Sequence, residues 1–367
     1  MSFNWKSTLR RIFVSPLKAI SVLIAVCLLL SYLSLYISPA KFWPIAYFGL
    51  LFQLFFVLNI ILLIIWALLR RKIVWVHLAV LLPSILFISS FIQLFSEQGI
   101  QRDNDLKVIS YNVQMFQLRF KKTDSTYLKI AAFLNSEKTD IVCLQEFYTA
   151  PGKLEDEDFS LRLSGLRHSY VYYSVEKKSY EYGIAIYSRY PIIDKGVVFT
   201  SPTGNAAIYA DIDIDGKIIR VYNNHLQSIR LNLPKSVRSI VNSNDERMGE
   251  IADVSLRLKA AFIKRAEQVN KVSAHVRQSP YPVVVCGDFN DTPMSYTYNT
   301  MKRGLKDAFC EAGQGMPSTH EGFFPSFRID YILHDKQINT TDYSVSDVQY
   351  SDHFPIISKI DIGNISI

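Results

Sequence analysis

Acidic, amide and histidine residues follow apolar, β-prone runs throughout the second two thirds of the chain. The clearest case is residues 282–293, PVVVCGDFNDTP, where a run of valines ends at Gly287, Asp288 and Asn290. Such a run predicts a strand buried on both faces, and the glycine lets the backbone bend at its end. Proteins of the α/β class usually carry their chemistry at the carboxyl ends of strands. Six further residues occupy comparable positions: Asn112, Glu146, His225, Asp330, Asp352 and His353.

Each of these residues has an ordinary structural explanation when it is taken alone. A strand-end acid is usually solvated, a single histidine is usually a satisfied structural residue, and GDFN by itself is equally an ordinary strand–turn signal. Eight such residues at the ends of separate apolar runs are harder to explain individually. The set therefore favours one shared functional site.

The residue types in the set suit a divalent cation and a general base. Carboxylate and amide oxygens are the ligands that Mg²⁺ prefers, and Glu146, Asn112 and Asp352 can supply them. We expect Mg²⁺ as the cofactor, with Mn²⁺ as the alternative ion. His353 becomes a proton acceptor when a carboxylate holds its ring. Asp330 is the best candidate partner, because an unpaired charge inside the apolar run RIDYIL would be costly.

The remaining polar residues can bind a phosphate group. His225, Asn112 and Asn290 can donate hydrogen bonds to non-bridging phosphate oxygens. A metal charge, amide donors and a His–Asp base together are suited to in-line hydrolysis of a phosphate ester. The set of residues therefore predicts a phosphoesterase site.

The N-terminal third has a different composition, which predicts a membrane domain over residues 1–97. Apolar runs at about residues 17–38, 44–69 and 73–95 each reach the ~20 residues that cross a bilayer as a helix. A cleaved signal peptide is the alternative for the first run. However, no small-x-small cleavage site follows it, and two more apolar runs come directly after. We therefore expect three transmembrane helices.

The basic residues set the expected orientation of these helices. Basic residues precede the first run and separate the second run from the third, and such residues stay on the cytoplasmic side of a membrane. The prediction is a multi-pass protein of a cell inner membrane, with a cytoplasmic N-terminus and an extracytoplasmic, periplasmic catalytic domain. The residues concerned are Lys6, Arg10, Arg11, Lys18, Arg70, Arg71 and Lys72.

The net charge of +7 belongs to the N-terminal third. Residues 1–96 contain eight Lys and Arg and no acidic residue, which leaves 32 basic and 33 acidic residues in residues 97–367. The larger part is therefore close to neutral, and no basic stripe with interleaved aromatic residues indicates a nucleic-acid surface. The four cysteines form no CxxC pair and predict small core residues rather than a zinc site.

The catalytic domain, residues 103–367, predicts a mixed α/β (α+β) fold. Helical spacing marks residues 123–138 and 255–276, and Asp215-Gly216 predicts a two-residue hairpin turn. The order of elements predicts two mixed sheets packed face to face with helices outside. Residues 226–253 show no clear pattern, and the basic residues of this region could hold an anionic substrate or form a solvated loop. Strands are expected at 106–111, 141–144, 170–175, 183–187, 197–200, 206–214, 217–224, 283–286, 328–333, 343–348 and 355–360.

Seven short motifs, in this order, resemble the endonuclease/exonuclease/phosphatase superfamily over residues 103–362. This resemblance implies the deoxyribonuclease-I-like fold, a four-layer sandwich. It further implies Glu146 as the main Mg²⁺ ligand with Asn112 and Asp352 nearby, and His353 as general base oriented by Asp330. The motifs are ISYNV (109–113), LQE (144–146), GIAIYSRYPI (183–192), NNHLQ (223–227), GDFN (287–290), RIDYIL (328–333) and SDHFPI (351–356).

The resemblance also implies roles for four other residues. Asp288 and Asn290 would lie at the scissile phosphate and position the nucleophile. His225 would match the second histidine of the deoxyribonuclease and sphingomyelinase branches, with Glu181 as a candidate carboxylate partner. Abasic-site endonucleases carry an amide in place of this histidine, so that branch is disfavoured.

Members of the superfamily cut DNA, RNA, sphingomyelin and inositol phosphates, so the chemistry is better determined than the substrate. We expect a membrane-anchored Mg²⁺-dependent phosphoesterase that hydrolyses a phosphodiester or a phosphomonoester. The alternatives are a DNA or RNA endonuclease or exonuclease, and a sphingomyelinase-like phospholipid hydrolase. The expected partner is thus a lipid headgroup, a nucleotide or a nucleic acid, and no protein partner can be inferred. A non-catalytic binding module is disfavoured, because no expected catalytic position is missing.

Overall fold

The computed structural model describes most of the chain. The described residues are 14–94, 105–117, 125–151, 154, 159–229, 244–321, 328–363 and 365, with the backbone alone for 244–251. Some residues on which the sequence predictions draw lie outside this set. They are Lys6, Arg10 and Arg11 of the N-terminal segment, and, among the basic residues of 226–253 that could hold an anionic substrate, Arg230, Lys235 and Arg238 and the side chain of Arg247.

Twelve strands in the described part of the chain form two mixed sheets. The pairs β1–β2 and β7–β8 are parallel, and the other pairs are antiparallel. The first sheet has the order β11 (Asn339–Val345), β12 (Ile356–Asp361), β1 (Leu106–Asn112), β2 (Ile141–Thr149), β4 (Tyr180–Ser188) and β3 (His168–Lys177). The second has the order β5 (Ile192–Thr200), β6 (Ala206–Ile214), β7 (Lys217–His225), β8 (Val283–Asp288), β10 (Asp330–His334) and β9 (Lys306–Asp307).

The two sheets pack face to face through their apolar inner faces. Val108 and Ile186 of the first sheet and Ile208 and Val284 of the second belong to one fully buried cluster. Cys143 and Cys286 lie in the same cluster as free thiols, which confirms the prediction of small core residues for these two cysteines. Alternation of side chains along each strand places these residues inside and leaves the opposite face for a helix.

Helices cover the outer faces and complete the predicted four-layer sandwich. On the first sheet, α7 (Thr126–Ser136) buries Ile130 and Leu134 against Val142. On the second sheet, α10 (Asn244–Arg277) buries Val269 and Val272 in one cluster with residues of the sheet and of the shorter α11 (Tyr296–Lys302). The short helix α12 (Ala308–Ala312) follows β9.

The predicted turn at Asp215-Gly216 and the helix predicted at residues 255–276 are both present in the structure. Asp215 and Gly216 have φ angles of 52° and 90°, as the predicted two-residue hairpin turn between β6 and β7 requires. The helix predicted at residues 255–276 is longer, because α10 begins at Asn244. Its first turns are polar, so they lack the apolar periodicity by which a sequence reveals a helix.

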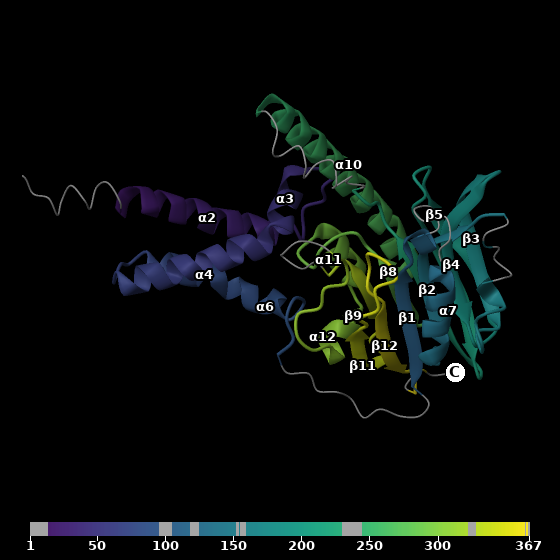
Figure 1. Ribbon diagram of the computed structural model, residues 1–367. Coiled ribbons are helices and arrows are strands. Elements are labelled where there is room, and N and C mark those ends of the chain that lie inside the picture. The colour runs from purple at the N-terminus through teal and green to yellow at the C-terminus, as the bar shows by residue number, and fades with distance from the viewer. Residues whose placement is uncertain are drawn as a thin grey trace, which may run out of the picture.

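The described part of the N-terminal third is helical, and its two longest helices extend away from the sandwich (Figure 1). Among the described residues, only α2 (Ser15–Leu33) is by itself long and apolar enough to cross a membrane. The next two, α3 (Pro44–Leu50) and α4 (Phe52–Leu68), meet that criterion only together and are bent by 62°. After them come α5 (Val74–Leu81), the 3₁₀ turn η2 (Leu82–Ser84) and α6 (Ile85–Ile88), a shorter apolar stretch.

The second predicted span is therefore not one straight helix. It breaks at Leu51, two residues after Gly49, whose backbone packs closely against the Met294 carbonyl and the Ser34 side chain. Kinks of this size usually have such a local cause. The described residues thus contain one or two candidate spans rather than clearly three.

Candidate active site

The strand-end residues converge because the fold brings the relevant strand ends together. Parallel pairing places the carboxyl ends of β1 and β2 side by side, and likewise those of β7 and β8. The strand β10 runs antiparallel to β8, so its first residue, Asp330, lies directly opposite Asp288. The loop before β12 carries His353 to the same end of the sandwich.

His353 is held by Asp330 in the interior of the site. Its Nδ1 lies 3.0 Å from Asp330 Oδ2 and 3.2 Å from Oδ1, and its Nε2 lies 3.7 Å from Asp288 Oδ2. Burial alone would lower the pKa of His353, but the Asp330 and Asp288 carboxylates outweigh burial and raise it to about 10. The carboxylate of Asp330 thus fixes the orientation of the ring.

Asp288 is the centre of a hydrogen-bonded group of amides. Its Oδ2 accepts bonds from Asn112 Nδ2 (3.0 Å) and Asn290 Nδ2 (2.9 Å), and its Oδ1 accepts one from Asn290 N. Burial raises the pKa of Asp288 above its ordinary value. Gly287 has a φ of 138° and packs against the backbone of Asn224, where a Cβ would collide. The glycine therefore permits the bend that places Asp288 in this group.

Glu146 reaches the site from a β-bulge. The register of β2 against β4 shifts between Gln145 and Phe147, and Glu146 has a φ of 54°. Bulges and left-handed residues of this kind often redirect a side chain at a functional site. Burial, together with the neighbouring Asp352 and Asp288, raises the pKa of Glu146 to about 7, against the opposing effect of His353. Its Oε1 lies 3.7 Å from His225 Nε2.

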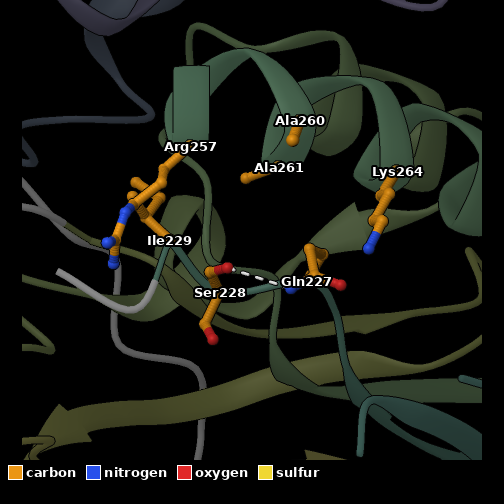
Figure 2. Close-up of a pocket in the computed structure, with 7 residues that line it drawn as sticks. All are labelled: Gln227, Ser228, Ile229, Arg257, Ala260, Ala261 and Lys264. Atoms are coloured by element: carbon orange, nitrogen blue, oxygen red, sulfur yellow. Dashed lines mark hydrogen bonds between the residues drawn. The ribbon is translucent and has the colours of Figure 1, made fainter. Parts of the chain in front are cut away.

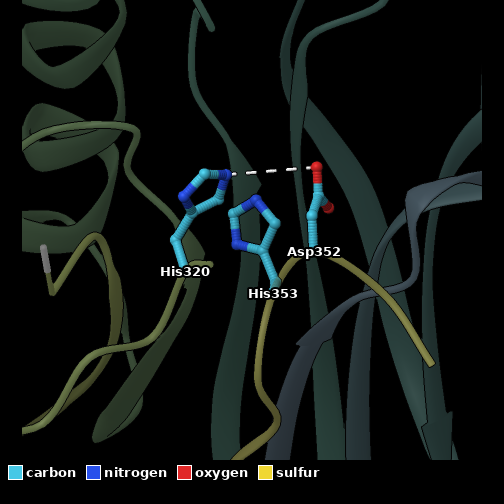
Figure 3. Close-up of side chains that lie close together, drawn as sticks. All are labelled: His320, Asp352 and His353. Carbon is cyan, nitrogen blue, oxygen red and sulfur yellow. Dashed lines mark ion pairs between the residues drawn. The ribbon is translucent and has the colours of Figure 1, made fainter. Parts of the chain in front are cut away.

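Asp352 lies at the more exposed side of the same site, next to two residues that the sequence analysis did not identify. Gln114 Nε2 donates to Asp352 Oδ2 at 2.7 Å. His320 Nε2 lies 4.0 Å from that oxygen, and its ring meets the ring of His353 edge-on (Figure 3). Burial and the neighbouring His353 lower the pKa of His320.

The donor set fits a divalent cation. Three carboxylates, Glu146, Asp288 and Asp330, are buried or nearly so, with Asp352 beside them. The nearby Arg265 is already bonded to Asp291 and to the Gln227 carbonyl, at 3.3 and 2.8 Å. Burial is the main reason that the pKa of Glu146 is raised, and the neighbouring Asp352 and Asp288 carboxylates add a concentration of negative charge that raises it further. A cation among these oxygens would balance it.

Two neighbouring cavities open at the site. The larger, of about 480 Å³, is lined by Glu146, Asp288 and His353 and also by apolar residues such as Phe262. The smaller, of about 240 Å³, shares Ser228 and Ile229 with it (Figure 2). Both cavities lie beside α10, which contributes Phe262 to one and Arg257 and Lys264 to the other.

Beneath the site, a buried polar connection joins the two sheets. Gln145 of β2 donates to Asn223 Oδ1 of β7 at 2.7 Å. The Nδ2 atom of Asn223 in turn donates to the carbonyls of Leu144 and Ala185 in the first sheet. Glu146 and His225 come one and two residues after these partners, so the connection sets how the two strand ends face each other.

Glu181, the candidate carboxylate partner of His225, has a different described contact. Glu181 Oε2 accepts a hydrogen bond from Thr149 Oγ1 at 3.0 Å. The described ion pairs of His225 are instead with Glu146, at 3.7 Å, and Asp288, at 3.9 Å. The pairing of His225 with Glu181 is therefore absent from the contacts described.

The sequence offered little signal for the residues that were missed. His320 forms an isolated β-bridge with His353 and does not follow an apolar run, and Gln114 lies in the turn η3 (Gln114–Gln117), whose residues all have positive φ. Arg265 lies on α10 and is buried by contacts with Asp291, which no local pattern reveals.

Comparison with protein families gives two matches. Residues 109–353 match a family described as the Endonuclease/Exonuclease/phosphatase family. Residues 10–91 match a family described as a domain of unknown function. No curated protein matches the chain.

Several solved structures share the fold of the two-sheet sandwich. An endonuclease/exonuclease/phosphatase from Beutenbergia cavernae is 21% identical, with 71% of this chain and 72% of that chain covered and a TM-score of 0.50. The human Nocturnin catalytic domain with bound sulfate is 18% identical, with 71% and 94% covered and a TM-score of 0.51. A humanized TDP2 from D. rerio is 16% identical, with 70% and 99% covered and a TM-score of 0.50.

Proposed function

This chain belongs to the Endonuclease/Exonuclease/phosphatase family and is a hydrolase of phosphate esters, and from this premise we propose that it is a membrane-anchored, Mg²⁺-dependent phosphoesterase. In this proposal residues 103–367 form the catalytic domain and residues 1–97 form the membrane domain. The observation that carries it is the pair formed by His353 and Asp330, with Asp288 beside it, in a cavity lined by carboxylates.

His353 is the proposed general base. Asp330 holds Nδ1, which leaves Nε2 for the proton of an attacking water. The water oxygen forms a new bond to phosphorus while the ester P–O bond breaks, and the leaving oxygen takes up a proton. Asp288 and Asn290, which are hydrogen-bonded to each other, position the water opposite the leaving oxygen.

Glu146, Asn112 and Asp352 would hold the Mg²⁺ ion, with Mn²⁺ as an alternative. When bound, the cation would polarise a phosphoryl oxygen and offset the buried negative charge that raises the pKa of His353. His225 and the amides contribute hydrogen bonds to the phosphate oxygens, where negative charge develops in the transition state. His320 lines the same cavity and can contribute another.

The membrane assignment rests on the apolar helices and on the positions of the basic residues. The apolar helix α2 supports a span, and Arg70, Arg71 and Lys72 follow α4 at the end remote from the sandwich (Figure 1). The proposed topology places that end in the cytoplasm and the catalytic domain in the periplasm, at the inner membrane. An alkaline-phosphatase reporter fused after Ser96 is expected to be active, whereas activity of a cytoplasmic reporter alone at this position would reverse the topology.

The test of the activity uses the full-length protein in detergent with bis-p-nitrophenyl phosphate. Hydrolysis is expected with Mg²⁺, with loss on addition of a chelator and recovery on return of the ion. A protein with intact secondary structure that shows no hydrolysis with Mg²⁺ or Mn²⁺ would contradict the proposal. Nicking of plasmid DNA at a higher kcat/KM than bis-p-nitrophenyl phosphate would favour the nuclease alternative.

A further inference from the structure

The cavity that contains the candidate catalytic residues is not made by the catalytic domain alone. Leu50, the last residue of α3, lines it together with Glu146, Asp288 and His353. Leu50 belongs to the N-terminal apolar segment, about one hundred residues before the first of these side chains. One wall of the cavity is therefore polar, and another is apolar and supplied from the membrane side.

The helix α3 is attached to α10 by specific contacts. Tyr47 Oη donates to the Ser255 carbonyl at 2.8 Å, and the Tyr47 ring meets the ring of Phe262 edge-on at 5.3 Å. Lys259 Nζ lies 4.9 Å from the centre of the Trp43 ring. Because Phe262 also lines the cavity, these contacts fix Leu50 relative to the site.

A second set of contacts joins the N-terminal segment to the loop after Asn290 and to the helix α11. Ser34 Oγ donates to the Met294 carbonyl at 2.9 Å, and Asn299 Nδ2 donates to the Leu35 carbonyl at 2.9 Å. The Met294 side chain is fully buried in one cluster with Leu28, Tyr32 and Phe52 of the apolar helices. The N-terminal helices are thus packed against the catalytic domain through an apolar cluster of their own, to which the domain contributes Met294.

These contacts place the cavity at one end of the apolar helices. The helix α2 ends at Leu33 and α4 begins at Phe52, and both run away from the sandwich from this point (Figure 1). Large apolar side chains are exposed along both helices, for example Leu23, Ile64 and Leu68. Such a surface is suited to hydrocarbon. The bend of 62° before α4 turns α3 toward the sandwich, at the level where the helices would leave the bilayer.

We propose that the substrate is a phosphate ester carried by a membrane lipid, which reaches the site from the bilayer surface; this rests on the proposed phosphoesterase function. The phosphate group occupies the polar wall, and the apolar part of the lipid lies against Leu50 and Phe262 on its way to the membrane. Water supplies the oxygen of the new P–O bond and gives up a proton, the ester P–O bond of the lipid breaks, and the leaving oxygen takes up a proton.

The charge around the cavity agrees with a lipid at the bilayer surface. Lys264 lines the neighbouring smaller cavity together with Arg257, which is also paired with Asp253 at 2.8 Å (Figure 2). Lys259, on the same helix α10, lies over the ring of Trp43. Basic residues at this level attract anionic headgroups. In contrast, residues 97–367 are close to neutral overall, which offers little long-range attraction to a nucleic-acid polyanion.

The experiment compares two substrates in the full-length protein reconstituted into vesicles of phosphatidylethanolamine, phosphatidylglycerol and phosphatidic acid. Release of headgroup or phosphate from these lipids is measured beside hydrolysis of water-soluble bis-p-nitrophenyl phosphate. Leu50→Asp introduces a charge into the apolar wall, and Leu50→Ala is the milder second variant. Leu161→Asp is the matched control, since Leu161 is 85% exposed on the catalytic domain and lies outside the cavity lining.

The wild type is expected to hydrolyse both substrates. Leu50→Asp is expected to lower the ratio of lipid to soluble-substrate hydrolysis at least ~10-fold, a tenfold change being about 1.4 kcal/mol. Leu50→Ala should lower it less, and Leu161→Asp should not change it. Hydrolysis of the soluble substrate without any lipid hydrolysis would overturn this inference alone, while hydrolysis of neither would overturn the proposed function. An equal loss of both activities in the two Leu50 variants would also overturn the inference, because Leu50 would then support the fold of the site.

Discussion

Asp288 and Asp330 face each other across the antiparallel pair of β8 and β10, and His353 contacts both carboxylates. Two buried carboxylates in directly opposed positions repel each other unless a positive charge or a proton lies between them. The imidazole of His353 is placed where it can carry that proton. His353 therefore reduces the repulsion between the two buried carboxylates. It is also a base whose proton affinity depends on Asp288 and Asp330.

Replacement of the proposed base should abolish most of the activity without unfolding the protein. His353→Ala removes the proton acceptor, and a decrease in kcat of about 10²–10⁴-fold is expected from general-base catalysis. The assay is hydrolysis of bis-p-nitrophenyl phosphate with Mg²⁺, beside circular dichroism. His168→Ala, on the edge strand β3, is the control and should keep wild-type activity. Wild-type turnover in His353→Ala would exclude His353 as the base.

Replacement of the partner of His353 should change the pH dependence as well as the rate. A carboxylate favours the charged imidazolium, so Asp330→Asn lowers the pKa of His353 from its raised value. The base must be neutral to accept a proton, so kcat/KM rises with pH as His353 loses its proton. The midpoint of that rise should therefore move to lower pH in Asp330→Asn, with a maximal rate reduced ~10-fold or more. An unchanged midpoint at equal Mg²⁺ concentration would show that another group titrates.

Glu146 should make the metal-free protein less stable as pH rises. Its pKa is raised from its ordinary value to about 7, so between about 4.5 and 7 the folded state binds more protons than the unfolded state. In the presence of chelator, the contribution of Glu146 to the free energy of unfolding is therefore complete below about pH 4.5. It is lost as the pH rises to about 7, and amounts to at most about 3 kcal/mol. Thermal unfolding of wild type and Glu146→Gln at pH 4.5 and pH 7.5 measures the difference.

The same variant tests the proposed metal ligand. Mg²⁺ at pH 7.5 is expected to raise the Tm of the wild type and to have a much smaller effect on Glu146→Gln, which should also need a higher Mg²⁺ concentration for activity. An equal Mg²⁺-induced shift of Tm in both proteins would remove Glu146 from the ligand set. An equal pH dependence in chelator would show that its carboxyl group is not the one that titrates.

Gly49 should be intolerant of any side chain. A Cβ at this position would collide with the Met294 carbonyl and with Ser34 Oγ, so Gly49→Ala forces α3 away from the loop that follows Asn290. Overpacking of this kind costs about 1–3 kcal/mol. A lower Tm in detergent and reduced hydrolysis are expected, whereas Ala67→Val, at an exposed position on α4, should change neither. A Gly49→Ala protein with wild-type Tm and activity would show that the close packing is dispensable.

The sequence allowed the catalytic domain to be predicted in some detail because its information is local. The run of valines before Asp288, the Asp215-Gly216 turn and the apolar spacing of α7 are each contained within a dozen residues. Both sheets and most of their strands could be anticipated in this way. The assignment of roles at the site drew in addition on motifs shared with a family.

Features that depend on distant contacts could not be predicted. The break at Leu51 coincides with packing against Met294, more than two hundred residues away. Arg328 is buried by Asp307 and by the Ser90 carbonyl, and His320 joins the site through a backbone bridge to His353. None of these contacts leaves a periodic pattern in the sequence, because each depends on a partner that the fold supplies.

The buried connection between Gln145 and Asn223 has a consequence for how the site could have diversified. If one sheet were shifted by one residue relative to the other, several buried amide groups would lose their hydrogen-bond partners at once. Such shifted alignments are therefore unstable. Changes in substrate specificity are therefore expected in the loops above the Gln145–Asn223 hydrogen bonds. The hydrogen bonds of Gln145 and Asn223 lie beneath the site, so substitutions in the loops at its rim leave this alignment of the two sheets in place.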